Sequence, residues 1–267
     1  MPINSFYGRW KYSTNISNTK EWQQSLPLFQ QYLEKQGLKT IINITAFAEA
    51  LNKGLYFDAN IPTGYGLGSS GALCAAILDT FGVNKEHLTL LELKHIFAQM
   101  ESFFHGASSG TDPLVSYLNY PILLGTTIKK VTITKEKNKG DLFLLDTNVQ
   151  RKASPFINGF LDRCKETFYD KRCSTQLVPL VDDAIHTFLN NQWELLFDTM
   201  HELSLFQYRY FDFMILDPFK QVWLEGLSSN HFKLKICGAG GGGFLLGISN
   251  DRKKTAAVLK KQKLIWL

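Results

Sequence analysis

The chain has 267 residues, of which 45% are hydrophobic and 20% are charged, and its formal net charge is +5. This composition is that of a globular protein with one large core or two smaller ones, and no stretch approaches the ~20 apolar residues of a transmembrane helix. The four cysteines form no CxxC pair, which argues against a zinc site or disulfide framework and favours a reducing cytoplasm. No nucleic-acid-binding motif accompanies the mild charge, so we expect neither a nucleic-acid nor a membrane partner.

In chain order, the first clear element is a strand over residues 55–61, where LYFDANI alternates and contains β-forming residues. The glycine-rich run PTGYGLGSSG follows over residues 62–71. Residues 72–81 are apolar on most faces and predict a buried helix. The order strand, glycine loop, helix is typical of a site that binds an anion.

The next helix has a start signal of its own. Thr89 is followed three residues later by Glu92, which together predict a capping box for a helix that runs to about Phe104. Residues 105–112 then form a Gly/Ser-rich loop.

The remaining pattern predicts strands and helices in a different proportion. Strands are expected over residues 131–134, 142–146, 234–237 and 244–248, and helices over 156–168, 178–190 and 193–205. We therefore expect an α+β fold of two lobes with a cleft between them. An N-terminal α/β lobe, residues 1–150, would precede a helix-rich C-terminal lobe, residues 151–267.

The loop over residues 64–70 has the composition of a phosphate-binding loop. Gly64, Gly66 and Gly68 allow positive φ and close approach of the backbone to a ligand. Ser69 and Ser70 add hydroxyls, one of which can ligate Mg²⁺ beside phosphate oxygens. The run is neither a Walker loop nor GxGxxG. The structural alternative is a tight turn before a capped helix.

This segment resembles the second motif of the GHMP kinases, P-x-x-x-G-L-G-S-S-A-A. The matching residues are Pro62, Gly66, Leu67, Gly68, Ser69 and Ser70. Gly71 stands where that family usually has alanine. The resemblance implies that the loop, from Pro62 through Gly64 to Gly71, wraps the phosphates of ATP and that Ser70 binds magnesium.

Two carboxylates, Glu101 and Asp112, bracket the Gly/Ser-rich loop. On the residues alone, a helix-end glutamate is usually solvated and an aspartate before Pro113 usually caps a helix. The string E-x-x-x-H-G-A-S-S-G-T-D, however, is similar to the mevalonate kinase version of the family, H-G-x-x-S-G-x-D. The resemblance implies that Glu101 coordinates Mg²⁺ and that Asp112 accepts the proton of the substrate hydroxyl or orients it. We interpret His105 as structural.

A run of glycines over residues 238–243 lies between two predicted strands. A hairpin turn needs only one or two glycines, and each further one costs about 0.5–1 kcal/mol relative to alanine, so the run suggests a close approach. It resembles the third GHMP motif, K-x-[ST]-G-A-G-x-G-G, with Cys237 in place of the hydroxyl residue. In that family the loop braces the phosphate loop and the substrate side, which implies substrate roles for Gly238, Ala239 and Gly240.

The chain departs from the family at its start. The first motif of the family, K-x-x-L-x-G-E, has no match in this sequence, and residues 1–3 resemble the strand that follows that motif. The resemblance therefore implies that roughly 20–30 residues, the size of one supersecondary unit, are missing at the start. After the strand at 142–146, Arg151 is a candidate for the substrate carboxylate, and Ser154 is a candidate to replace a family threonine.

The resemblance implies a kinase that uses ATP and Mg²⁺ to phosphorylate a small-molecule hydroxyl, with mevalonate to 5-phosphomevalonate as the favoured reaction. A homodimer is compatible with this interpretation. Two alternatives stay open: another GHMP kinase acting on a sugar, homoserine or phosphomevalonate, and a truncated chain that binds nucleotide without turnover.

Overall fold

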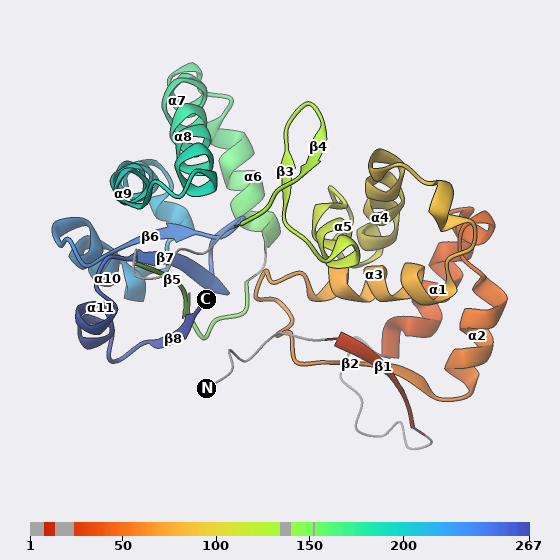
Figure 1. The fold of residues 1–267 in the computed structure, drawn as a ribbon. Helices are drawn as coiled ribbons and strands as arrows, with labels where there is room; N and C mark the ends of the chain where they lie inside the picture. Colours follow the sequence, from red (N-terminus) through yellow and green to blue (C-terminus); the bar gives the residue numbers. More distant parts are fainter. Residues whose placement is uncertain (1–7, 14–23, 134–139, 152) are drawn as a thin grey trace. The chain divides into compact units, whose positions relative to one another are not determined.

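The computed structural model describes the whole chain except residues 1–7, 14–23, 134–139 and 152 (Figure 1). The chain divides into two compact units. The N-terminal unit comprises the described residues of Asn4–Thr63 and Leu67–Val131. The C-terminal unit comprises those of Thr132–Leu267 together with Gly64–Gly66.

The boundary between the two compact units therefore lies earlier in the chain than the domain boundary expected near residue 150. The reason is that the strand β5 (Asp141–Asp146) pairs with β7 (Phe244–Ser249) and so is part of the C-terminal sheet. The assignment of residues 1–150 and 151–267 as functional domains stays a prediction.

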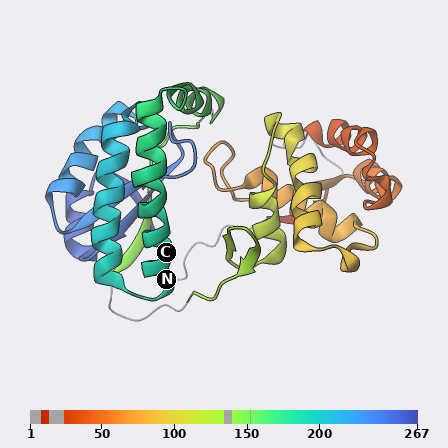
Figure 2. The same ribbon diagram turned by 90° about the horizontal axis from the view of Figure 1, so that it is seen from above.

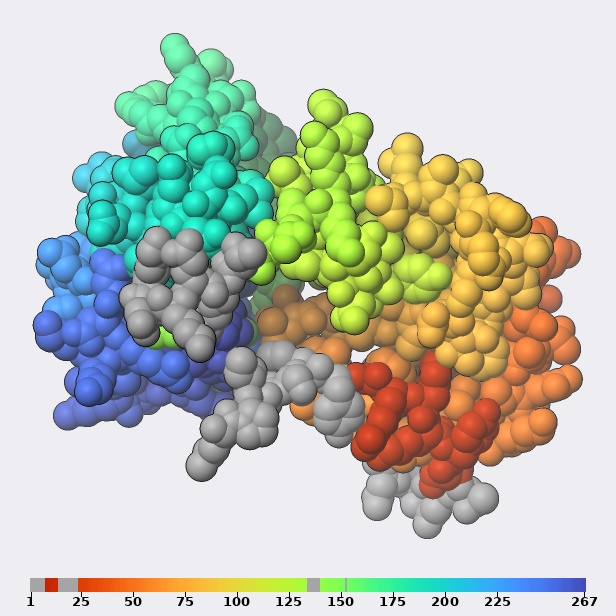
Figure 3. Space-filling model, in the orientation of Figure 1, coloured from red at the N-terminus to blue at the C-terminus, as the bar shows by residue number. Residues whose placement is uncertain are grey.

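The N-terminal unit is mainly helical around a two-stranded antiparallel sheet of β1 and β2. Its elements are β1 (Gly8–Tyr12), α1 (Leu26–Lys35), α2 (Ile44–Asn52), β2 (Leu55–Ala59), α3 (Ser69–Phe81), α4 (Leu90–His105), α5 (Thr111–Leu118), β3 (Ile122–Leu124) and β4 (Ile128–Lys130). Phe29, Phe47, Phe57 and Phe97 are completely or almost completely buried in one core. Strands β3 and β4 form a hairpin that projects from the surface of this unit (Figure 3).

Local signals explain the starts of the two helices that matter most for the site. The Thr89 hydroxyl accepts a hydrogen bond from the Glu92 amide, and the Glu92 carboxylate accepts one from the Thr89 amide, so the predicted capping box of α4 is confirmed. Gly68, with φ 69°, is the residue before the first turn of α3. The expected strand at 55–61 and helix at 72–81 are also confirmed, with slightly different ends.

The C-terminal unit is a four-stranded antiparallel sheet with helices on both faces (Figure 1). The strand order is β6-β7-β5-β8. Its elements are β5, α6 (Ala153–Arg163), α7 (Thr167–Arg172), α8 (Val178–Leu189), α9 (Trp193–Tyr210), α10 (Asp217–Ser228), β6 (Phe232–Ile236), β7, α11 (Arg252–Val258) and β8 (Lys263–Trp266). Helices α8 and α9 lie side by side (Figure 2), and Leu196 and Met200 of α9 pack near Leu142 and Ile248 of the sheet.

Two sequence expectations need correction, and one alternative interpretation is not observed. The helix expected over 156–168 is interrupted at Cys164–Glu166, between α6 and α7. The strand expected at 131–134 is wrong for residues 131–133, because β4 ends at Lys130; residue 134 lies outside the described residues. The structural alternative for Asp112, a cap for α5, is not observed, since Gly110 is the cap residue.

One junction in this unit is unusual. A π-helical turn, η5 (Cys173–Leu177), links α7 to α8, and the residues at both of its ends keep right-handed helical dihedrals. The chain therefore continues as one helical segment in which a single turn is wider than in an α-helix. Among the described residues, no helix is long and apolar enough to cross a membrane.

Candidate functional site

The glycine loop before α3 has an alternating backbone conformation. Gly64, Gly66 and Gly68 have φ values of 75°, 70° and 69°, whereas Tyr65 and Leu67 between them do not have positive φ. Alternation of this kind turns successive amide groups toward one side, as in the nests that bind anions. Only glycine adopts it without steric cost at three positions. The positive φ expected at these three glycines is confirmed. Their role in binding phosphate stays a prediction.

The loop leads directly into α3, which is 13 residues long. Pro62 precedes the loop in a half-buried, non-helical segment, and Ser69 and Ser70 open the helix. The unpaired amides of the first turn carry partial positive charge. The N-terminal end of α3 and the loop therefore favour the same kind of ligand, an anion.

Ser70 and Glu101 meet in the N-terminal unit. The Ser70 hydroxyl donates to Oε1 of Glu101 at 2.9 Å, and the Ser108 hydroxyl donates to Oε2. Glu101 is 5% exposed, so these two donors offset much of the cost of burying its carboxylate. Burial, and secondly the Glu101 charge, raises the pKa of the Cys74 thiol one helical turn beyond Ser70.

The donor pair fits Mg²⁺. Two oxygens bound side by side to octahedral Mg²⁺, at 2.0–2.1 Å from the ion, lie roughly 2.9 Å apart. The Ser70–Glu101 hydrogen bond of 2.9 Å is compatible with this value, as an ordinary hydroxyl–carboxylate hydrogen bond would be. Among the described residues, no group of three or more His, Cys, Asp or Glu side chains forms a metal cluster. An ion held by Ser70 and Glu101 would therefore take its other ligands from phosphate and water, as Mg²⁺ usually does.

His105 also reaches this site, which the sequence did not predict. Its Nε2 atom lies 2.9 Å from the Ser70 hydroxyl. Because that hydroxyl gives its proton to Glu101, we assign the proton of this contact to His105 Nε2. The signal was present in the sequence, since Glu101 and His105 are four residues apart on α4 and so share a helix face.

Asp112 lies in the first turn of α5, and its residue is exposed. A Cβ at Gly68 would lie 3.5 Å from the Asp112 Cβ, and a Cβ at Gly71 would lie 2.8 Å from the Pro113 nitrogen. The absence of side chains at these two glycines lets the start of α5 approach the start of α3. The structure thus brings Asp112, Ser70 and Glu101 into neighbouring parts of one unit.

The glycine run over residues 238–243 packs against the C-terminal unit itself. The Gly243 amide donates to the Val149 carbonyl, and the Thr147 hydroxyl donates to the Gly243 carbonyl, each at 2.7 Å. A Cβ at Gly243 would lie 2.4 Å from the Tyr65 carbonyl oxygen. The close approach predicted from the glycine run is therefore, at least in part, an approach to the backbone of Val149 and Tyr65. Tyr65 belongs to the loop over residues 64–70.

Arg151 lies between the two glycine-rich segments of this unit. Its amide donates to the Gly64 carbonyl at 2.8 Å, and its Nη1 donates to the Cys237 carbonyl at 2.7 Å. Any Cβ at Gly66 would lie 2.4 Å from the guanidinium, and one at Gly238 would lie 3.0 Å from it. Arg151 thus holds the segments together, and its predicted role in substrate binding stays a prediction.

The other predicted substrate residues are near the same segments. Ser154 is exposed in the first turn of α6, and Gly238 is exposed at the start of the glycine run. Ala239 is half-buried, and Gly240 is buried where a Cβ would meet the Met214 carbonyl at 2.6 Å. Their roles in substrate binding stay predictions.

Comparison with known proteins confirms the resemblance. Residues 33–120 match the family model of the GHMP kinases N terminal domain. That range contains the phosphate-loop motif, Glu101 and Asp112. A comparison with curated protein sequences finds no matching relative.

Solved structures extend the similarity to the fold of the chain. The L. major mevalonate kinase in complex with R-mevalonate is 14% identical and covers 91% of this chain and 74% of its own, with a TM-score of 0.62. The Lactococcus lactis galactokinase complexed with galactose is 13% identical, covers 99% and 85%, and has a TM-score of 0.66. The Streptococcus pneumoniae phosphomevalonate kinase is 14% identical, covers 99% and 89%, and has a TM-score of 0.63. The chain has the mixed α and β fold of the GHMP kinases.

Proposed function

We propose that this GHMP-kinase-like chain is an ATP-dependent small-molecule kinase whose nucleotide site is the loop Gly64–Gly71. The observation that carries the proposal is the alternating backbone of Gly64, Gly66 and Gly68, which leads into α3 and the Ser70–Glu101 pair. A nest, a helix N-terminus and two hard oxygen donors in succession suit the charges of Mg-ATP.

The residues divide the work of phosphoryl transfer as follows. The amides of the loop and of the first turn of α3 donate to the nucleotide phosphates, and Ser70 and Glu101 hold Mg²⁺. When bound, the ion neutralises charge that develops on the phosphate oxygens. Asp112 accepts or orients the proton of the substrate hydroxyl. The support for this role is that Asp112 is exposed and lies next to Gly68. Gly238, Ala239, Gly240, Arg151 and Ser154 are the proposed substrate side.

The proposed reaction is mevalonate to 5-phosphomevalonate. Its support is the HGASSGTD string, which is similar to the mevalonate kinase version of the motif, and the mevalonate kinases among the structural neighbours. Galactokinase and phosphomevalonate kinase have comparable TM-scores, so fold similarity alone favours none of these substrates. A cytoplasmic location and a homodimer stay proposals.

The test is a direct assay of acceptors. The purified chain is incubated with Mg-ATP and, separately, with mevalonate, phosphomevalonate, galactose or homoserine, and ADP release and the phosphorylated product are measured by coupled assay and ³¹P NMR. We expect turnover with mevalonate. Turnover with another acceptor would retain the kinase and reject the substrate. Mg-ATP binding without turnover on any of them would favour the non-enzyme alternative.

A further inference from the structure

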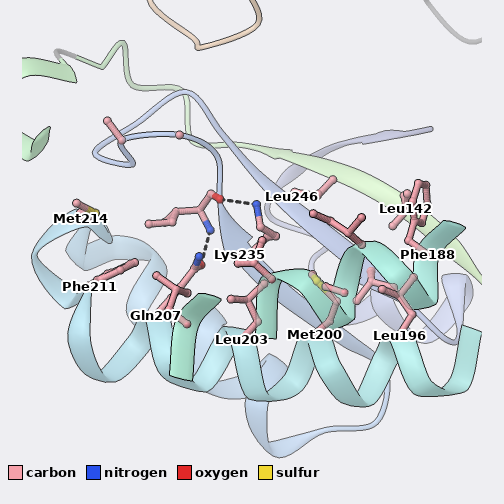
Figure 4. Close-up of a pocket in the computed structure, with 18 of the residues that line it drawn as sticks. Leu142, Phe188, Leu196, Met200, Leu203, Gln207, Phe211, Met214, Lys235 and Leu246 are labelled. Carbon is pink, nitrogen blue, oxygen red and sulfur yellow. Dashed lines mark hydrogen bonds between the residues drawn. The ribbon is translucent and has the colours of Figure 1, made fainter. Parts of the chain in front are cut away.

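The C-terminal unit contains a pocket of about 650 Å³ between α8, α9 and the sheet (Figure 4). Its lining is drawn from α6, η5, α8, α9, the residues Phe211 and Met214 that follow α9, β5, β6, β7 and the glycine-run residues Gly238 and Ala239. All of these belong to one unit. A close-packed core has few voids larger than a water molecule, whereas ligand pockets measure roughly 300–1,000 Å³. The volume is therefore that of a ligand site.

The pocket is elongated along α9. Leu196, Met200, Leu203, Gln207 and Phe211 line it, with spacings of three and four residues that place them on one face of the helix. At 1.5 Å per residue, this stripe is roughly 22 Å long. A long, narrow apolar surface of this kind suits an extended hydrocarbon chain better than a compact ring system.

The lining is apolar with two polar exceptions, the side chains of Gln207 and Lys235. Both lie together on the backbone of Ile236: its amide donates to Gln207 Oε1, and Lys235 Nζ donates to its carbonyl, each at 2.9 Å. Figure 4 shows this pair away from the end formed by Leu142, Phe188 and Leu196. The pocket thus has a polar region and an apolar end.

Lys235 retains capacity to bind an anion. Its ammonium group has three N–H donors, and within the described part of the chain one of them has a hydrogen-bond partner, the Ile236 carbonyl. Lys235 is half-buried as a residue and lies among apolar side chains of the lining, where a cation gains from an anionic partner. The amide nitrogen of Gln207 is a second donor beside it.

We propose that this pocket binds a single-chain amphiphile with a carboxylate head, a long-chain fatty-acid anion. The head contacts Lys235 and Gln207, and the hydrocarbon tail lies along α9 toward Phe188 and Leu142. One cation matches a monoanion, whereas a diphosphate head would bring further negative charge into apolar surroundings without a partner. The pocket lacks the Gly64–Gly71 loop, Ser70 and Glu101, but Gly238 and Ala239 of the proposed substrate side also line it. The test below measures binding alone, so its outcome is separate from that of the kinase assay.

The test measures binding of dodecanoate to the whole chain by isothermal titration calorimetry, below the concentration at which the ligand forms micelles. The neutral probe is 1-dodecanol. We expect Lys235→Met to weaken dodecanoate binding by about 10- to 100-fold, the worth of one charge-assisted hydrogen bond, and to leave dodecanol binding unchanged. The matched control is Lys261→Met, an exposed lysine of the same unit outside the pocket, which should not change either affinity.

Two further variants fill the pocket from α8, Ala184→Trp and Val181→Trp. Each should abolish binding of both probes, and Val181 is 38% exposed, so its variant is the safer one for folding. Failure of the parent to bind dodecanoate, equal affinity for the acid and the alcohol, or unchanged binding in both tryptophan variants would each overturn the proposal. A dimer that dissociates in Val181→Trp, together with no dodecanoate binding in the parent, would assign the pocket to a second copy instead.

Discussion

The hydroxyl of Ser70 and the carboxylate of Glu101 lie 2.9 Å apart although 31 residues separate them in the chain. One is in the first turn of α3 and the other near the end of α4. Glu101 is buried and Ser70 is half-buried, so the two donors are held in place by the packing of these helices before any ligand binds. A preorganised pair of this kind lowers the entropy cost of binding a metal ion.

Removal of either donor should weaken Mg-dependent nucleotide binding. Ser70→Ala and Glu101→Gln each take away one hard oxygen ligand. Loss of a residue that only hydrogen-bonds to a metal ligand lowers metal affinity roughly 10–100-fold, and we expect a loss of affinity at least as large here. The measurement is the rise in melting temperature with Mg-ATP compared with ATP plus EDTA. The matched control is Glu92→Gln on the same helix, which loses cap stability and should keep the Mg-dependent part of the shift. Parental Mg dependence in both site variants would reject this metal site.

Asp112→Asn should preserve the fold and nucleotide binding yet lower turnover by about 10²–10⁴-fold, the usual worth of a positioned general base. The amide keeps the size of the carboxylate in the first turn of α5. Asp217→Asn is a close control, because Asp217 also stands before a proline in the first turn of a helix, α10. Turnover is measured at saturating Mg-ATP with the acceptor that the parent phosphorylates. Equal turnover in the two variants would remove the catalytic role of Asp112.

Gly71→Ala should destabilise the chain even though alanine is the better helix former. The substitution gains up to about 1 kcal/mol of helix propensity, but its Cβ would lie 2.8 Å from the Pro113 nitrogen, and overpacking of this kind costs roughly 1–3 kcal/mol. Gly159→Ala in α6 makes the same change where the nearest atom is a Phe213 ring carbon at 3.3 Å. Urea unfolding should give a lower midpoint for the first variant than for the second. The reverse order would show that α5 moves away at little cost.

Stability should fall in alkaline solution partly because of Cys74. Burial raises the pKa of its thiol well above the ordinary value of 9.0. Between the unfolded and the folded pKa the unfolded chain holds fewer protons, so deprotonation favours unfolding and stability is lost as the pH rises above about 9. Below that value the contribution is fully present. The urea midpoint of Cys74→Ala should therefore change less between pH 8 and pH 10 than that of the parent, and identical changes would contradict the assignment.

Local patterns predicted the parts of this molecule that depend on a few adjacent residues. The alternating glycines before α3 and the Thr89–Glu92 capping box are of this kind, because backbone sterics and one hydrogen bond decide them. Partners distant in the sequence were not predictable from the same signals. The pairing of β5 with β7, which moves the packing boundary, depends on residues about a hundred positions away.

In the candidate site, too, local motifs were predictable and contacts between distant residues were not. Ser70, Glu101 and Asp112 were identified through a motif, and the structure places them in one unit. The role of Arg151 in joining two glycine segments was not predicted, since it depends on how Gly66 and Gly238 pack against one guanidinium. The alternative role of Asp112, a helix cap suggested by Pro113, is not observed. Gly110 adopts the left-handed conformation two residues earlier and is the cap residue of α5.

The π-helical turn between Cys173 and Leu177 determines which side of α8 faces α9. A π-helical turn rotates less per residue than the roughly 100° of an α-helix. If the same residues formed an ordinary α-helical turn, every later position of α8 would be rotated relative to α7. Val181 and Ala184, which line the pocket, would then turn away from it, and neighbours such as Asp182 and Asp183 would approach. The character of the pocket wall thus depends on the conformation of a turn outside α8 as well as on the residues of the wall itself.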